Sequence, residues 1–222
     1  MQSESSVSPE IETLDPNCAF CQRSSIINYI LKETPTFRII ADHAPLVPGH
    51  MLIVPRNHYA CYGAVPASLD GELQALKYEV QRFFVRYYEP SVFWEHGVFR
   101  QTVFHAHLHC FPFGETHYNP SKHLHELQIS TQNDIRTWYS THGQYFYLED
   151  IHHAFLFAAR QDSYQYIIQK VLWQAALARS KQTAWLPPRQ RQERGGPFIQ
   201  ELQAKWQLFQ EEEKNHANST ST

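Results

Sequence analysis

The spacing of apolar residues predicts three strands in the first half of the chain. Apolar side chains dominate 36–42 and 51–54, and a loop with two prolines and one glycine separates the two runs. Short apolar runs bounded by turn residues are typical of buried strands, and strands joined by a short loop are usually antiparallel neighbours. A third strand is predicted over 91–96, with a turn at Gly97.

Between Ser68 and Glu89 the apolar residues follow a helical period. Six positions recur on one face there: Leu69, Leu73, Leu76, Val80, Phe83 and Tyr87. The stripe predicts an amphipathic helix that packs on a core, with Ser68 as its N-cap and Pro90 as its end. A shorter helix is predicted over 25–32.

Residues 102–111 have a period of two, because His105, His107 and His109 alternate with small or apolar residues. On a strand the three imidazoles would share one face, with neighbouring Cα atoms about 6.5–7 Å apart. The opposite face would pack on the core through Phe104, Ala106, Leu108 and Cys110. Each imidazole must place two ring nitrogens, so three in a row are poor core material and indicate a metal site or a catalytic site.

The pattern weakens after Gly114. A strand pair is predicted over 144–147 and 154–157, with its turn at Glu149 and Asp150. Helices are predicted over 164–179 and 198–213, on either side of a basic loop at 187–197. The polar ends, 1–13 and 215–222, are expected to be disordered. The chain is therefore predicted to have an α+β fold, with an antiparallel sheet around one long helix.

Composition narrows the function classes. With 222 residues, of which 42% are hydrophobic, the chain forms one generous domain or one domain with an extension. A net charge of −3 gives no basic field for nucleic acid. Four unevenly spread cysteines indicate a reducing compartment. Without an apolar leader or a membrane-length apolar run, we expect a cytoplasmic protein that binds no membrane.

Cys18 and Cys21 form a Cys-x-x-Cys pair. This spacing is typical both of zinc sites and of thiol–disulfide exchange. The redox chemistry requires a strand before the pair, and none is predicted there. The pair becomes a zinc site if two further ligands lie near it.

The histidine segment and the residues before it resemble the histidine-triad (HIT) superfamily of nucleotide hydrolases and transferases. The stretch 105–109 fits the His-x-His-x-His signature, and 48–58 resembles the family's Pro-Gly-His strand followed by Pro-x-x-His. Residues 101–103 resemble the Gln-Ser/Thr-Val that precedes the triad, and the cysteine pair resembles the zinc-bearing branch. The resemblance covers about 15–113. It implies a HIT domain over 14–114, with 115–214 as a C-terminal α/β extension packed on it.

The resemblance implies chemistry at the α-phosphate of a nucleotide. His107 would attack the phosphorus and form a nucleotidyl-histidine, which water or another acceptor resolves. His109 and His50 would hold the nonbridging oxygens. The family pattern adds further contacts from Thr102, Gln101 and Asp42, whereas Arg100 stands where the family usually has a glycine and could supply charge to the phosphate instead. Asp42 would accept from both ribose hydroxyls, although a turn residue that bonds its own backbone is the alternative for this position.

The resemblance also implies a zinc ion held by Cys18, Cys21, His58 and His105. Two thiolates and two imidazoles make a closed tetrahedral site, which is structural rather than catalytic. Such a site would tie the N-terminal segment to the strand that carries His107.

Several functions stay open at this point. A histidine at position 109 goes with hydrolysis in this family, so the substrates implied are dinucleoside polyphosphates, phosphoramidates and adenylylated conjugates. The alternatives are a nucleotidyltransferase, a nucleotide-binding protein without turnover, and a metal-dependent hydrolase that uses all three histidines. The family also implies a homodimer. For the extension, one hypothesis is that it folds over the nucleotide site and that Arg160 reaches a phosphate.

Overall fold

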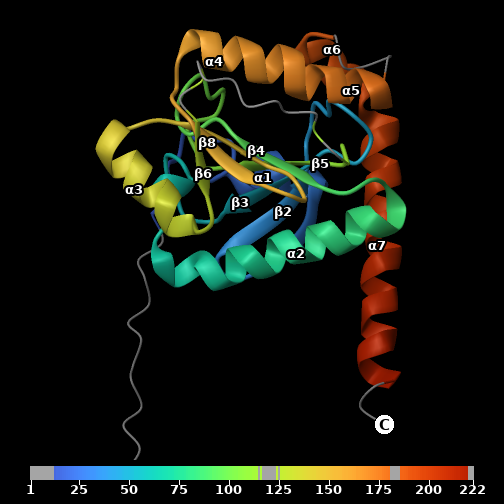
Figure 1. Cartoon of the computed structure of the whole chain (residues 1–222). Helices are drawn as coiled ribbons and strands as arrows, with labels where there is room; N and C mark the ends of the chain where they lie inside the picture. The colour runs from blue at the N-terminus through green and yellow to red at the C-terminus, as the bar shows by residue number, and fades with distance from the viewer. Residues whose placement is uncertain (1–12, 115, 117–123, 125, 181–185, 220–222) are drawn as a thin grey trace, which may run out of the picture.

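The computed structural model describes residues 13–114, 116, 124, 126–180 and 186–219. Its centre is an antiparallel sheet in the order β1-β2-β3-β5-β4-β7-β8-β6 (Figure 1). The strands are β1 Ile30–Glu33, β2 Phe37–Ala41, β3 Met51–Pro55, β4 Val92–Glu95, β5 Leu108–Phe111, β6 Glu126–Ile129, β7 Phe146–Glu149 and β8 Ala154–Phe157. The predicted α+β class is confirmed.

Helices cover the sheet on both sides (Figure 1). They are α1 Arg23–Ile26, α2 Asp70–Tyr87, α3 Gln132–His142, α4 Gln161–Tyr166, α5 Trp173–Arg179, α6 Pro188–Arg194 and α7 Gly196–Ser219. A π-helical segment, Ile167–Leu172, joins α4 to α5, and 3-10 turns occur at Ile27–Tyr29, Tyr62–Ala64 and Ala67–Leu69. In Figure 1, α2 lies below the sheet, α4 and α5 lie above it, and α7 stands beside it. None of the described helices is long and apolar enough to cross a bilayer.

The two faces of the sheet pack on different cores, which explains the apolar runs of β2 and β3. On one face, Leu108 and Phe93 pack with the apolar stripe of α2. On the other face, Trp94 and Phe111 pack with the extension, including Ile167. Every residue of β2 and β3 is buried, because α2 covers one side of these strands and the N-terminal segment covers the other. A strand buried on both faces needs a continuous apolar run.

The histidine strand is shorter than predicted. β5 begins at Leu108, so of the three histidines only His109 lies in a strand, and the chain before it is irregular. The Ala106 N–H donates to the Tyr59 carbonyl at 2.6 Å, so it joins no strand ladder. Phe104, expected in the core, is 61% exposed. Period two therefore holds only from His105 onward, because the chain before it turns, with the His105 N–H donating to the Val103 carbonyl at 2.8 Å.

Other predicted elements also need correction. The stretch 25–32 is not one helix, because it contains a short helical segment followed by β1. The N-cap of α2 is Leu69 rather than Ser68, since a 3-10 turn precedes the helix. The basic stretch 187–197 contains α6 and the start of α7, not a loop. α7 also continues to Ser219, while most of the N-terminal stretch expected to be disordered lies outside the described residues.

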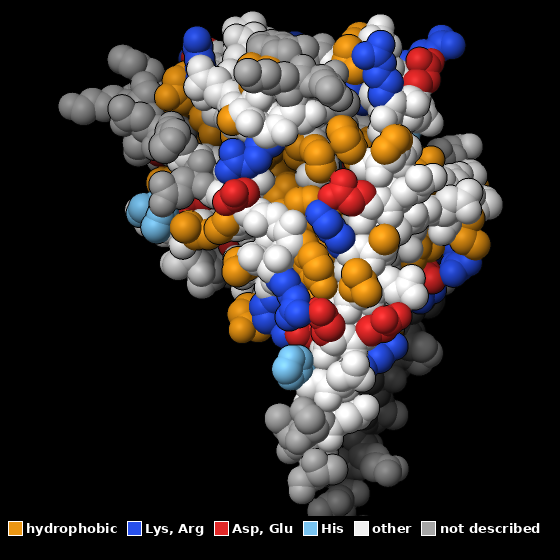
Figure 2. Space-filling view, turned by 90° about the vertical axis from the view of Figure 1, so that its right-hand side faces the viewer, with side chains coloured by type: hydrophobic (Ala, Val, Ile, Leu, Met, Phe, Trp, Pro, Cys, Tyr) orange, Lys and Arg blue, Asp and Glu red, His pale blue; other side chains and the backbone are white. Residues whose placement is uncertain are grey.

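The second half of the chain continues the sheet and both cores. β7 pairs with β4, and the predicted pairing of the 144–147 and 154–157 strands is confirmed by β7 and β8. α7 packs against α2 through aromatic rings, with the Trp206 centroid 4.9 Å from that of Phe83. The sequence pattern did not predict β6 and α3. Figure 2, which views the α7 side of the molecule, shows hydrophobic side chains interspersed with charges of both signs.

Candidate functional site

Two thiols and two imidazoles meet between the N-terminal segment and the start of the histidine segment. The Cys18 Sγ lies 3.4 Å from the His105 Nδ1, and the Cys21 Sγ lies 3.3 Å from the His58 Nδ1. One donor atom from each of the four residues lies within 4.8 Å of the other three. We call these four residues the cysteine cluster.

The chemistry of the cysteine cluster fits a zinc ion. The Nε2 of His105 lies 2.8 Å from the Pro55 carbonyl oxygen, so this nitrogen donates and Nδ1 keeps its lone pair toward the sulfurs. Burial lowers the pKa of His105 to about 4, which favours the neutral, metal-binding imidazole. Burial raises the pKa of the Cys21 thiol to about 11, so a thiolate there needs a cation beside it. The predicted ligands are thus brought together with donor atoms facing one another.

His107 lies next to this cluster and is almost completely buried. Its Nδ1 is 2.7 Å from the backbone carbonyl oxygen of His105, which can only accept. Nδ1 therefore carries the proton, and Nε2 keeps a lone pair. The Gln101 amide nitrogen donates to the same carbonyl at 3.3 Å, so two donors hold one acceptor.

His50 and His109 form a hydrogen-bonded pair in contact with His107. The Leu46 N–H donates to the His50 Nδ1 at 3.2 Å, and the His50 Nε2 lies 3.0 Å from the His109 Nδ1. If each ring is neutral, this chain of bonds places the His109 proton at Nε2, where it can donate to a ligand. The His109 ring centroid lies 5.0 Å from that of His107. We call Asp42, His50, His107 and His109 the triad cluster.

Asp42 completes the triad cluster from the end of β2. It is 9% exposed, accepts from the Ala44 N–H at 2.7 Å, and has Oδ2 3.6 Å from the His50 Nε2. Burial raises the pKa of Asp42. The electrostatic effect of His50 and its other neighbours lowers it and outweighs burial, so the net pKa lies below the ordinary value. The alternative for this position, a turn residue that bonds its own backbone, thus holds in part. Asp42 accepts from the Ala44 N–H and also lies close to His50.

Three predicted neighbours of this cluster are exposed to solvent. Thr102 is exposed, and Arg100 is exposed with its guanidinium 5.3 Å from the centre of the Tyr164 ring in the extension. Arg160 pairs with exposed Asp162 at 3.0 Å, so the structure gives no support to its predicted reach toward a phosphate.

Glu95 ends β4, the strand that pairs with the histidine-bearing β5. It lies on the α2 face, where it accepts from the Tyr62 N–H at 2.7 Å. The Tyr145 hydroxyl also donates to it, at 2.5 Å. The carboxylate is thus separated from the triad cluster by the sheet.

The comparison with protein families now bears on this geometry. Residues 23–116 match the family model described as the HIT domain. The chain contains a HIT domain. The resemblance seen in the sequence is confirmed over these residues, and it supports, in general terms, a nucleotide-binding hydrolase or transferase.

Known proteins similar to this chain share the HIT domain. An uncharacterized HIT-like protein of Mycoplasma genitalium is 29% identical over 109 residues, a match that covers 45% of this chain and 75% of that protein. A HIT family hydrolase from Clostridium thermocellum is 26% identical, with a TM-score of 0.38 over 49% of this chain and 98% of that one. A Zn-bound histidine triad family protein from Mycobacterium smegmatis is 22% identical, with a TM-score of 0.39 over 56% and 94%.

The structure brings two further residues to the triad cluster that the sequence did not single out. His96 follows β4, and its ring centroid lies 6.0 Å from that of His109. Arg191, from α6, acts electrostatically on His50, His109 and Asp42. The sequence signal for Arg191 was a basic stretch with three arginines, which did not indicate the one that faces the site.

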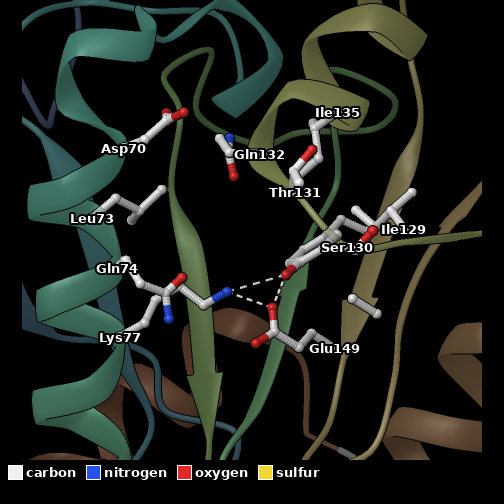
Figure 3. A pocket seen from close by; sticks show the side chains of 12 residues that line it. Asp70, Leu73, Gln74, Lys77, Ile129, Ser130, Thr131, Gln132, Ile135 and Glu149 are labelled. Atoms are coloured by element: carbon white, nitrogen blue, oxygen red, sulfur yellow. Dashed lines mark hydrogen bonds and ion pairs between the residues drawn. The ribbon is translucent and has the colours of Figure 1, made fainter.

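A second hollow of about 270 Å³ lies on the opposite face of the sheet, among α2, α3 and β7 (Figure 3). Lys77 donates there to the Tyr147 hydroxyl at 3.2 Å and to Glu149. Arg136 binds Asp70 through both guanidinium nitrogens at its rim. These charged groups are paired with one another, whereas the HIT signature residues lie on the other face.

Proposed function

We propose that this chain is a nucleotide hydrolase that cleaves at the α-phosphate through a covalent intermediate on His107. The observation that carries the proposal is the 2.7 Å contact between the His107 Nδ1 and the His105 carbonyl oxygen. A ring that donates from Nδ1 has its lone pair at Nε2, which makes Nε2 the nucleophile. The carbonyl also fixes the orientation of the ring.

The reaction has two steps. The His107 Nε2 forms a bond to the α-phosphorus, and the bond to the leaving group breaks with its electron pair on that group. The ring then carries a positive charge, which the His105 carbonyl stabilises through the proton on Nδ1. In the second step a water oxygen bonds to phosphorus, the P–N bond breaks, and the water proton passes to solvent.

The other members of the triad cluster have supporting roles in this proposal. The His109 Nε2–H would donate to a nonbridging oxygen, and His50 would hold His109 in the tautomer that does so. Asp42 would accept from the ribose hydroxyls. Gln101 would position the His105 carbonyl rather than touch the phosphate, because its amide nitrogen already donates to that carbonyl.

The proposal includes a structural zinc ion in the cysteine cluster. It is supported by the convergence of four donor atoms and by the second-sphere bond from His105 to Pro55. The ion would hold the segment that carries Cys18 and Cys21 against His105 and thereby support the carbonyl that fixes His107.

The experiment is to trap the intermediate. Purified protein is mixed with diadenosine tetraphosphate or adenosine phosphoramidate labelled at the α-phosphorus, quenched within milliseconds to seconds, and digested for mass mapping. We expect acid-labile label on the peptide that contains His107, none with His107→Ala, and wild-type labelling with the exposed control His142→Ala. Hydrolysis with no labelled protein at any time would contradict the covalent route. Release of the label to an added phosphate or amine acceptor in place of water would identify a transferase.

The turn at 97–100 favours a second candidate function, nucleotide binding without turnover. Val98 and Arg100 have φ values of 82° and 56°, which side-chain-bearing residues rarely adopt. Arg100 and Thr102 are also exposed. Equal, negligible rates for wild type and His107→Ala, together with tight nucleotide binding by both, would assign this function instead.

A further inference from the structure

The extension holds the loop that carries two members of the triad cluster. Asp42 and His50 lie at the ends of the β2–β3 loop, and between them Leu46 and Val47 pack in the same core as Ile167 of the extension. The loop is therefore buried between the HIT domain and helices that lie outside the family match.

The last turn of α6 touches the same loop. A Cβ added to Gly195 would lie 2.6 Å from the Pro45 Cδ and 2.7 Å from the Arg191 carbonyl oxygen. Only a residue without a side chain allows this approach. Gly195 thus brings α6 against the loop, and with it the arginine four residues earlier.

Arg191 lies close enough to the triad cluster to interact electrostatically with it, and the Asp42 carboxylate is the opposite charge that acts on it there. Its Nε is buried and has no hydrogen-bond partner among the residues that the structure describes. Its charge acts on Asp42, His50 and His109. The first two lie at the ends of the β2–β3 loop, and His109 lies in β5. A buried guanidinium nitrogen without an acceptor is costly, so this position fits a ligand that supplies one.

The imidazoles of the cluster do not provide the charge that a phosphate requires. Burial lowers the pKa of His50 to about 4 and places the pKa of His109 well below its ordinary value, so both rings are neutral donors near pH 7. An arginine stays protonated even when partly buried. The permanent positive charge at this site therefore comes from α6.

We propose that Arg191 is an anion-binding residue of the triad site, supplied by the extension, and that its guanidinium binds the phosphate of a nucleotide held by His50 and His109. The identity of the anion as a nucleotide phosphate rests on the proposed function. The inference concerns binding, so it does not require that the chain turns over a substrate.

A metal cation is the rival occupant of this position. One donor atom each from Asp42, His50 and His109 lie within 4.8 Å of one another, which resembles an open three-ligand site. A guanidinium at the same place repels a cation and attracts an anion, and it can form two parallel hydrogen bonds to phosphate oxygens. The charge of Arg191 favours the anion.

The test compares nucleoside monophosphates with their nucleosides by calorimetry, on the full chain with its metal. AMP, GMP and UMP each carry the phosphate, and adenosine, guanosine and uridine serve as uncharged probes. We expect Arg191→Ala to weaken monophosphate binding about 10- to 100-fold and to leave nucleoside binding within about twofold. Arg191→Lys keeps the charge without the planar donor pair, so it should recover part of the loss.

The matched control is Arg189→Ala, on the same helix. Arg189 is exposed and pairs with Glu193 at 3.3 Å, so this variant should bind like wild type. Raising the salt concentration should weaken monophosphate binding more in wild type than in Arg191→Ala.

A second pair of variants tests the placement of α6. Gly195→Ala adds a methyl group against Pro45 and should weaken monophosphate binding, whereas Gly196→Ala, with nothing within 4 Å of the added carbon, should not. Both variants are checked for unchanged thermal unfolding and nucleoside binding. A loss confined to monophosphates separates a moved arginine from a damaged fold.

Three results would overturn the inference. They are equal monophosphate affinity in wild type and Arg191→Ala, no preference of wild type for monophosphates over nucleosides, and monophosphate binding that disappears on chelation while Arg191→Ala behaves like wild type. The last would assign the position to a cation. A preference that depends on Arg191, without turnover or a labelled His107, would uphold the inference and reject the proposed hydrolase.

Discussion

The cysteine cluster and the triad cluster lie side by side, yet they suit ligands of opposite charge. The first combines two thiols with His58 and His105. The thiols can ionise to thiolates there only if a cation binds beside them. The second combines neutral imidazoles and the Asp42 carboxylate with an arginine beside them, and in our proposal the arginine binds an anion. The same residue type thus serves two chemistries, and the neighbours of each ring decide between them.

His105 connects the two clusters. Its ring faces the cysteines, while its carbonyl oxygen accepts from His107. A backbone carbonyl moves with its own Cα, so a change in how the ring is held displaces the acceptor that orients the nucleophile. The comparison therefore predicts an asymmetry, in which damage to the cysteine cluster reaches the triad cluster and the reverse does not occur.

The largest expected effect is on turnover by His107→Ala. Removal of the proposed nucleophile should lower the rate about 10⁴-fold or more, because the covalent route is lost. The zinc content, measured by elemental analysis, should match wild type. Zinc loss in this variant would contradict the asymmetry, since His107 is not among the proposed ligands.

Cys21→Ser tests the other direction. Loss of a thiolate ligand should remove the metal and lower the free energy of unfolding by roughly 4 kcal/mol, because metal binding contributes to folding. Turnover should fall as well, through the His105 carbonyl. Denaturant unfolding and elemental analysis are the measurements, and Cys61→Ala, which changes a buried thiol on the α2 face, should keep its zinc. Full activity without zinc would show that the clusters are independent.

Glu95→Gln tests whether the α2 face is separate from both clusters. Burial raises the pKa of Glu95 to about 7, even though its two hydrogen bonds lower it. Between pH 4.5 and 7 the carboxyl holds its proton when folded and loses it when unfolded, so this group makes stability fall as pH rises through that window. The contribution is about 3 kcal/mol.

Glutamine carries no titrating proton, so the difference in unfolding free energy between wild type and Glu95→Gln should change with pH by that amount. The titratable groups that face Glu95 are Tyr62, Cys61, Tyr139 and Tyr145. Lys77 lies near it as well, because both residues line one small hollow under the sheet. They are the same in both proteins and largely cancel. A constant difference from pH 5 to pH 8 would contradict the raised pKa, and zinc content should be unchanged.

The smallest effect is expected for Gln101→Leu. It removes one of the two hydrogen bonds to the His105 carbonyl, which is worth about 1 kcal/mol, or about five- to tenfold in turnover. Because the amide positions the carbonyl, the change should appear in kcat rather than KM. The exposed Gln165→Leu on α4 is the control. An increase in KM alone would indicate that Gln101 contacts the substrate directly.

The sequence predicted the elements whose apolar pattern is determined by burial alone. β2 and β3 are buried on both faces, and α2 has one apolar stripe, so their patterns reflect burial alone. The strand through His105 was predicted too long, because contacts with Pro55 and Tyr59, distant in sequence, override the local period. Among the described strands β6 pairs only with β8, and it has just one buried residue, so its pattern was too weak to predict.

The residues of the candidate site likewise fall into those that the sequence predicted and those that it could not identify. The motif spacing brought out the cysteine cluster and the triad cluster, and the structure places their members together. It could not identify Arg191, because three arginines share one short stretch and only the packing of Gly195 on Pro45 determines which one faces the site. Thr102 was predicted from the family pattern and Arg100 as a departure from it, and the structure leaves both side chains exposed.

The pairing of β7 with β4 has a consequence for self-association. β4 is the last strand that the HIT domain match contributes on that side of the sheet, and without the extension its outer N–H and C=O groups would form an open edge. In this chain β7 occupies that edge through the register of Phe93 with Glu149. A second copy therefore cannot extend the sheet at β4, and among the strands that the structure describes, β1 and β6 are the outermost ones.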